Sequence, residues 1–156
     1  YLGVVHVIWL KGGIEGDDTD GHIDNLARFV RSDTVLCAYE EDESDENHAV
    51  LKENYDLLIR SKDQDGRPLN IIKLPMPPAH RSFLRGKTVR LPSSYLNFYI
   101  ANGVVVVPVF GHGKDRQVRG ILQDVFPGRL IVPIDCSDLV YGSGALHCIT
   151  QQQPAL

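Results

Sequence analysis

The sequence has few cysteines, no long apolar run and little excess charge of either sign. Its three cysteines, Cys37, Cys136 and Cys148, are an odd number and include no CxxC pair. This pattern argues against both a disulfide framework and a zinc ribbon. It is typical of a reducing compartment, so we expect a cytoplasmic protein.

Several classes of partner are also disfavoured. No apolar run approaches the roughly 18 residues of a membrane span, and no basic-then-apolar segment opens the sequence. We therefore expect no membrane association. The net charge of −4 argues against a nucleic-acid partner, which would need clustered Lys and Arg. A small cationic ligand is compatible with this charge.

The 156 residues are enough for one domain with an ordinary core. The sequence opens at Tyr1, and its first ten residues, YLGVVHVIWL, already have the composition of a strand. We therefore expect this chain to be part of a longer protein. A trimmed mature start is the alternative.

A supersecondary unit occurs twice along the chain. In GHIDNLARFV, polar and apolar residues alternate with the period of two that is typical of a strand. The predicted elements of the first unit are strands over 22–30 and 34–39, a helix over 47–61 and a strand over 69–74. Those of the second are strands over 94–101 and 104–110, a helix over 114–126 and a strand over 129–134.

The predicted fold is therefore α/β, with ββαβ units at about 22–74 and 94–134. A third unit would begin at 139–150, with Cys148 on its first strand. Repetition with such a unit as the period indicates a radial or stacked architecture. Between the units, residues 74–94 are rich in Pro and Arg and show no period, so we expect a long loop that is either functional or a plain connection.

Four residues are the candidates for chemistry. In a strand, His22 and Asp24 would share a face, because residues two apart point the same way. A shift of 73 residues places Asp24 on Asn97, so equivalent strands would bring both to the axis of a ring. Cys148 follows a Gly-Ser-Gly turn that allows close approach of the backbone. Each residue alone is more often structural, and their combination is the signal.

Other polar residues carry weaker signals. Cys37 lies in the middle of a predicted strand and Cys136 follows a carboxylate, so both are expected to be inert. The remaining histidines show no metal-ligand spacing. The cluster Asp17-Asp18-Asp20 suits a solvated turn better than a cation site.

Three segments carry a resemblance to a known family: DDTDGHIDNLARFV, SYLNFYIANGVVVVPVFG and HCITQQQP. Together they resemble the agmatine deiminases, part of the guanidine-modifying superfamily that includes bacterial peptidylarginine deiminase. The resemblance runs over nearly the whole chain. It implies that residues 1–156 are the C-terminal part of a single deiminase domain, within a five-unit pseudosymmetric α/β propeller, or pentein.

The resemblance also implies roles for the four candidates. Cys148 matches the nucleophile and His22 the general acid and base, whereas Asp24 and Asn97 match residues that bind the guanidinium. The implied reaction converts agmatine to N-carbamoylputrescine and ammonia through a covalent amidino-cysteine, with no metal or organic cofactor. The sequence departs from the family at two positions. The family tends to have Gly where Ser143 stands, and Gly or Asn where Ala145 stands. The family's other guanidinium-binding carboxylate comes from an N-terminal half that is absent here.

Three other functions remain open. Deimination of free or peptidyl arginine would need a cation for the α-carboxylate, for which Arg81, Arg85 and Arg90 are candidates. A non-catalytic module that binds guanidines or polyamines is the alternative from another class, and a thiol protease is the weakest. Unpaired strands at the edges of an open ring would pair with another chain, so we expect a homo-oligomer.

Overall fold

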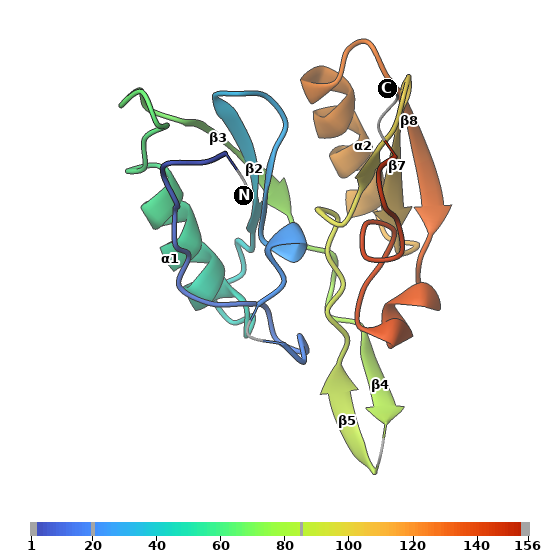
Figure 1. Ribbon diagram of the computed structural model, residues 1–156. Coiled ribbons are helices and arrows are strands. Elements are labelled where there is room, and N and C mark those ends of the chain that lie inside the picture. Colours follow the sequence, from blue (N-terminus) through green and yellow to red (C-terminus); the bar gives the residue numbers. More distant parts are fainter. Residues whose placement is uncertain (1–2, 20, 85, 154–156) are drawn as a thin grey trace.

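The computed structural model describes residues 3–19, 21–84 and 86–153. Two small α/β units lie side by side, and a two-stranded hairpin projects from the end where they meet (Figure 1). Among the described residues, no helix is both long and apolar enough to cross a membrane.

The first unit begins with a 3-10 turn, η1 (Ile23–Asn25), and a short strand, β1 (Ala27–Phe29). Strand β1 pairs antiparallel with β2 (Thr34–Tyr39), and β2 pairs in parallel with β3 (Asn70–Pro75). The helix α1 (His48–Leu58) makes the crossover between the parallel strands. Parallel pairing requires such a crossover, because a tight turn can join only antiparallel strands.

The second unit has the same topology. Strand β6 (Tyr99–Ile100) pairs antiparallel with β7 (Val104–Val109), and β7 pairs in parallel with β8 (Leu130–Asp135). The helix α2 (Lys114–Val125) makes the crossover, and a second 3-10 turn, η2 (Leu139–Gly142), follows. Both units therefore have the order of elements ββαβ.

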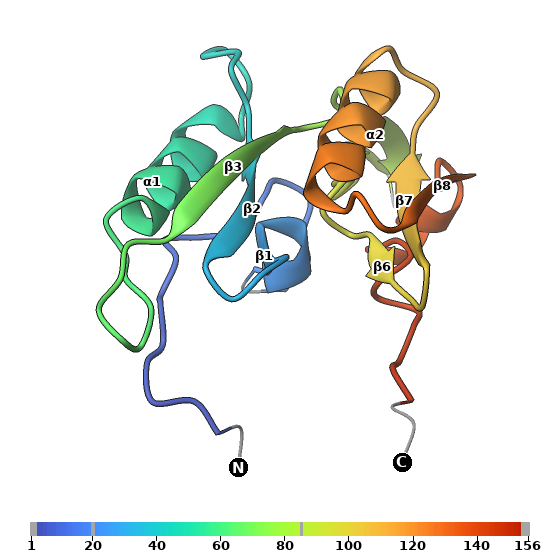
Figure 2. The same cartoon turned by 90° about the horizontal axis from the view of Figure 1, so that it is seen from above.

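One apolar core extends through both units. Leu36 and Leu51 from the first unit belong to the same buried cluster as Val105, Val107 and Leu122 from the second. Helix α2 lies between the first sheet and strand β7, and it contacts β3 (Figure 2). The units are thus held together by burial of apolar surface, which stabilises by about 25 cal/mol per Å².

Four predictions of local structure were wrong. The strands predicted over 22–30 and 94–101 are shorter, because a turn occupies the first residues of each range. Residues 3–10 form no strand. The segment 74–94 is not a featureless loop, since it contains the hairpin of β4 (Arg81–Leu84) and β5 (Lys87–Arg90).

Candidate active site

Two equivalent turns lie at the junction of the units. The Asn25 N–H donates to the His22 carbonyl at 3.1 Å, and the Asn97 N–H donates to the Ser94 carbonyl at 3.3 Å. Each turn ends two residues before a short strand, β1 or β6, and both asparagines are fully buried. The repeat therefore has an offset of 72 here, not 73, and Asn97 is equivalent to Asn25 rather than to Asp24.

The buried Asn97 amide organises the segment that carries Cys148. Its Oδ1 accepts hydrogen bonds from the backbone N–H groups of Ala145 at 3.2 Å, His147 at 2.9 Å and Cys148 at 3.4 Å. Its Nδ2 donates to Asn25 Oδ1 at 2.9 Å and to Cys148 Sγ at 3.1 Å. One amide thus fixes the backbone that leads into the cysteine and donates a hydrogen bond to its sulfur.

The exposed Cys148 thiol lies beside Asp24. Its Sγ donates to Asp24 Oδ2 at 3.4 Å, and the same oxygen is 2.7 Å from His147 Nδ1. Burial raises the pKa of the Cys148 thiol, hydrogen bonds from Asn97 and Ala145 lower it, and Asp24 raises it. The net effect is a pKa above the ordinary value, so a cation at Asp24 would favour the thiolate.

Gly144 has no room for a side chain, because Cys148 occupies that space. A Cβ at Gly144 would lie 2.6 Å from Cys148 Sγ and 2.8 Å from its Cβ. The preceding residue, Ser143, has a left-handed backbone with φ of 65°. The close approach predicted for this glycine-rich turn is confirmed, and the group that approaches is the nucleophile candidate itself.

His22 lies apart from this hydrogen-bond network and is held by Asp17. The Asp17 side chain accepts the His22 N–H at 2.8 Å and approaches His22 Nδ1 at 3.4 Å. It also accepts the N–H and hydroxyl of Thr19. Burial raises the pKa of Asp17, but these hydrogen bonds and the His22 charge bring it below the usual value.

The structure brings together three of the four predicted residues: Asp24, Asn97 and Cys148. In the described part of the chain, no hydrogen bond or ion pair joins His22 to them. The strand-face argument for His22 and Asp24 was wrong, because residues 22–25 form a 3-10 turn. Cys148 also lies in a turn and not on a strand.

The other two cysteines, Cys37 and Cys136, are fully buried. Burial raises the pKa of Cys37 to about 12, and burial together with Asp135 raises that of Cys136 to about 11. Sequence reasoning set aside His147, which contacts Asp24 from 123 residues away. Only its position next to Cys148 could have drawn attention to it.

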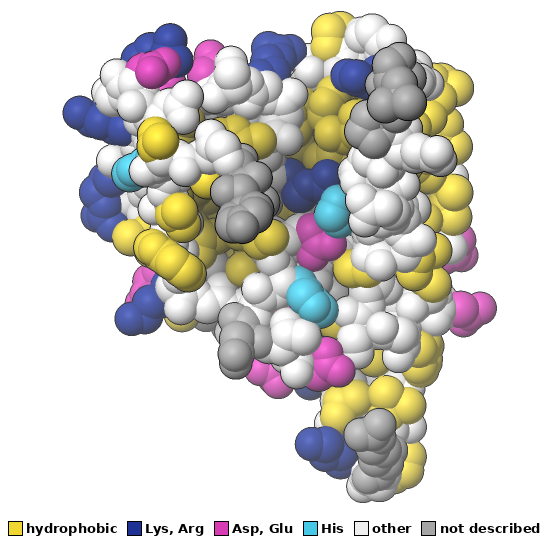
Figure 3. All heavy atoms as spheres, viewed as in Figure 1, with side chains coloured by type: hydrophobic (Ala, Val, Ile, Leu, Met, Phe, Trp, Pro, Cys, Tyr) yellow, Lys and Arg dark blue, Asp and Glu magenta, His cyan; other side chains and the backbone are white. Residues whose placement is uncertain are grey.

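Charged side chains meet at the surface where the units adjoin. In Figure 3, acidic, basic and histidine side chains gather along this junction. Within residues 3–19, 21–84 and 86–153, no group of three or more His, Cys, Asp or Glu side chains is placed to hold a metal ion. Two residues named in the sequence analysis lie outside the described residues: Asp20 of the aspartate cluster and Arg85, a candidate to bind an α-carboxylate.

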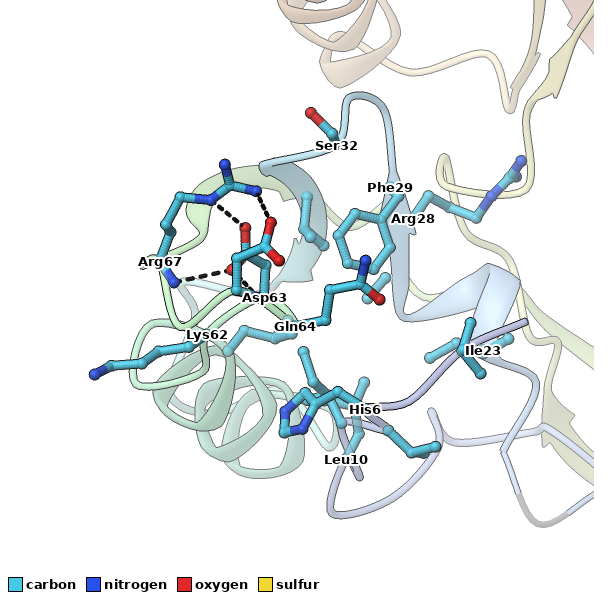
Figure 4. Close-up of a pocket in the computed structure, with 17 residues that line it drawn as sticks. His6, Leu10, Ile23, Arg28, Phe29, Ser32, Lys62, Asp63, Gln64 and Arg67 are labelled. Atoms are coloured by element: carbon cyan, nitrogen blue, oxygen red, sulfur yellow. Dashed lines mark hydrogen bonds and ion pairs between the residues drawn. The ribbon is translucent and has the colours of Figure 1, made fainter. Parts of the chain in front are cut away.

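A separate apolar cavity of about 540 Å³ lies against β1. Phe29, Ile23 and Leu10 line it, and the Arg28 guanidinium points away from it towards the second unit (Figure 4). Neither Asp24 nor Cys148 lines this cavity, so it is distinct from the candidate site.

The chain is similar in sequence and fold to known deiminases. The family model described as Porphyromonas-type peptidyl-arginine deiminase matches residues 1–154. An agmatine deiminase of Stutzerimonas stutzeri is 40% identical over 169 residues, which cover 99% of this chain and 46% of that protein. The solved agmatine deiminase of Enterococcus faecalis is 35% identical, with a TM-score of 0.90 over 99% of this chain and 46% of that one.

A third relative extends the similarity to a lower level of identity. The agmatine deiminase of C. jejuni is 30% identical, with a TM-score of 0.76 over 90% of this chain and 40% of that one. The chain spans less than half the length of the curated relatives it matches, 44% for a Legionella pneumophila protein and 46% for that of S. stutzeri. On the match over residues 1–154, the chain belongs to the Porphyromonas-type peptidyl-arginine deiminase family.

Proposed function

We propose that this chain contributes the nucleophile of an enzyme that hydrolyses the guanidinium group of agmatine, giving N-carbamoylputrescine and ammonia. One observation carries the proposal: Cys148 Sγ lies 3.4 Å from the Asp24 carboxylate and 3.1 Å from the Asn97 amide. A carboxylate can hold a planar guanidinium through its N–H edges. That would place the central carbon within reach of the sulfur.

The proposed reaction has two steps. The Cys148 thiolate attacks the guanidinium carbon, a C–S bond forms, and one C–N bond breaks as ammonia leaves with a proton from His22. Water, deprotonated by the same imidazole, then attacks the amidino carbon. A C–O bond forms, the C–S bond breaks, and the thiolate is regenerated with the ureido product.

The charges around Cys148 suit a cationic substrate. Without substrate, Asp24 raises the pKa of the thiol. A bound guanidinium would neutralise that carboxylate and so favour the thiolate. Because Asn97 is fully buried, its contacts support a role in holding the nucleophile more than direct contact with the substrate.

We further propose that the whole protein is a five-unit α/β propeller of which this chain supplies the two complete units seen here. The support is the repeated ββαβ topology and the similarity to solved deiminases that are more than twice as long. His22 would then act in a site that the rest of the protein completes.

Agmatine is favoured over arginine because two of the arginines predicted to bind an α-carboxylate already have acidic partners. Arg81 pairs with Glu46 at 2.7 Å, and the buried Arg90 pairs with Asp45 at 2.7 Å. Both arginines are therefore already matched by carboxylates of the neighbouring loop. The curated relatives cited above are also named agmatine deiminases.

The test is incubation of the 156-residue chain and its Cys148→Ala variant with agmatine, arginine and a peptidylarginine, followed by measurement of ureido product. We expect product from agmatine with the parent chain only. If that chain is inactive, the same pair is tested in the full-length protein. Ureido product from a full-length Cys148→Ala variant would refute the mechanism, and preference for arginine would refute the substrate.

A further inference from the structure

Arg28 on β1 reaches across the unit boundary to the segment that carries Asn97. Its Nη1 donates to the Phe98 carbonyl at 2.8 Å and to the Leu96 carbonyl at 3.2 Å. Its guanidinium also lies over the Phe98 ring, 4.7 Å from the ring centroid. Arg28 therefore holds the backbone on both sides of Asn97.

This contact has a direct consequence for Cys148. The Asn97 amide can serve the three N–H groups of the nucleophile segment and the sulfur only if its backbone is fixed. Arg28 is half-buried and makes no ion pair within the described residues, so its charge is not neutralised by direct contact with a carboxylate. Buried charges act more strongly than exposed ones, because water screens them less.

We propose that Arg28 is a positioning residue for Cys148, which fixes Asn97 and supplies a permanent positive charge that favours the thiolate. The inference rests on the proposed function only in taking Cys148 as the nucleophile. Among the described residues, Asp24 on η1 contacts the sulfur directly, His147 in the same turn contacts Asp24, and Arg28 on β1 contacts the backbone on both sides of Asn97. Burial lowers the pKa of Arg28, and the charges of Asp24 and Cys148 raise it.

The role makes sense of an otherwise unfavourable arrangement. Asp24 lies against the thiol, and a carboxylate there opposes formation of the thiolate before any substrate arrives. A fixed guanidinium in the protein offsets part of that effect. A substrate guanidinium bound at Asp24 would add the remainder.

The test measures the pH dependence of Cys148 alkylation by iodoacetamide in the 156-residue chain, with the modified site located by peptide mapping. Cys37 and Cys136 are fully buried, so reaction in the folded chain reports on Cys148. In Arg28→Gln we expect the midpoint to rise by about one pH unit, with alkylation about tenfold slower at neutral pH. Arg116→Gln, which removes an exposed charge from α2, should keep the parental midpoint.

A merely structural role predicts a different result. A loosened segment that keeps the contact between Asn97 Nδ2 and Cys148 Sγ would change the rate at high pH, where the thiol is fully ionised, and would leave the midpoint unchanged. A parental midpoint in folded Arg28→Gln would therefore overturn the proposal. If that variant does not fold, as judged by circular dichroism, Arg28→Lys decides. Its ammonium keeps the charge but lacks the planar fork that suits two carbonyls, so we expect a smaller rise in midpoint, and a parental profile would overturn the role of Arg28 in positioning Asn97.

The readout does not depend on turnover. A shifted midpoint in a chain that releases no ureido product would support the role of Arg28 and leave the substrate open. An unshifted midpoint in an active chain would refute the role of Arg28 and leave the proposed function intact.

Discussion

The side-chain amide of Asn97 donates a hydrogen bond to Asn25 Oδ1 at 2.9 Å and so joins the equivalent turns of the two units. Both side chains are fully buried, one just before β1 and the other just before β6. The contact is short and shielded from water. It ties the segment that carries Cys148 to the first unit as well as to the second.

Removal of the Asn97 amide should destabilise the chain. In Asn97→Ala, the backbone N–H groups of Ala145, His147 and Cys148 lose the side-chain oxygen that accepts their hydrogen bonds. An unsatisfied buried donor costs about 1–3 kcal/mol, so we expect the free energy of unfolding to fall by about 2–4 kcal/mol. Urea denaturation measures the change. The exposed amide variant Gln117→Ala is the matched control, and it should change stability by less than about 0.5 kcal/mol. Equal stability of Asn97→Ala and the parent would contradict the assigned hydrogen bonds.

Two elements with clear apolar patterns were predicted to within one residue. Helix α2 was expected over 114–126 and spans Lys114–Val125, because Val118, Leu122 and Val125 fall on one buried face. Strand β7 was expected over 104–110 and spans Val104–Val109. In α2 the spacing of the apolar residues matches the period of a helix, and in β7 a short unbroken run rich in valine favours a strand.

The turns that build the site could not be predicted in the same way. In residues 22–30, the alternation of polar and apolar residues indicates which side chains are buried, but it does not give the backbone conformation. A 3-10 turn can bury Asn25 and Leu26 just as a strand would. A one-residue error in the repeat then paired Asn97 with Asp24. The contact of His147 with Asp24 depends on the packing of segments 123 residues apart, and no local pattern encodes it.

A methyl group at position 144 should displace the nucleophile. The added Cβ of Gly144→Ala would meet Cys148 Sγ at 2.6 Å, a separation at which one of the two atoms must move. We expect ureido formation in a chain that is otherwise active to fall by at least about 100-fold, the size of loss that follows a shift of about 1 Å. Gly142→Ala lies in the same segment with no heavy atom near its Cβ, and it should retain parental activity. Similar losses in both variants would mean that the segment, and not the contact with Cys148, is sensitive.

Neutralisation of Asp24 should separate thiol ionisation from turnover. Asp24→Asn removes a negative charge and a carboxylate acceptor that both raise the pKa of Cys148. The thiol pKa should therefore fall, and alkylation by iodoacetamide below the parental midpoint should become faster. Agmatine turnover should be lost, because the amide cannot neutralise a guanidinium. Slower alkylation in the variant would show that Asp24 favours the thiolate, contrary to the arrangement described here.

The loop that holds His22 should contribute a pH-dependent part of the stability. The Asp17 side chain is 2% exposed, and its pKa lies below the usual 3.8 in the folded chain because of the bonds from His22 and Thr19. A carboxyl group with a lowered folded pKa stabilises the chain above its unfolded pKa, and the contribution is lost as the pH falls through the folded value. The parent should therefore lose stability as the pH falls from about 5 towards 2, more steeply than Asp17→Asn.

The parent and Asp17→Asn should also differ at neutral pH. The substituted amide would replace one carboxylate oxygen by an N–H group, which cannot accept the hydrogen bonds that now reach Asp17. We therefore expect a loss of about 1–2 kcal/mol at pH 7. Urea denaturation across the pH range measures both effects. The exposed Asp138 makes no side-chain cap hydrogen bond at η2, and Asp138→Asn is the matched control. Parallel pH profiles for the parent and Asp17→Asn would mean that the carboxylate is not what holds His22 in place.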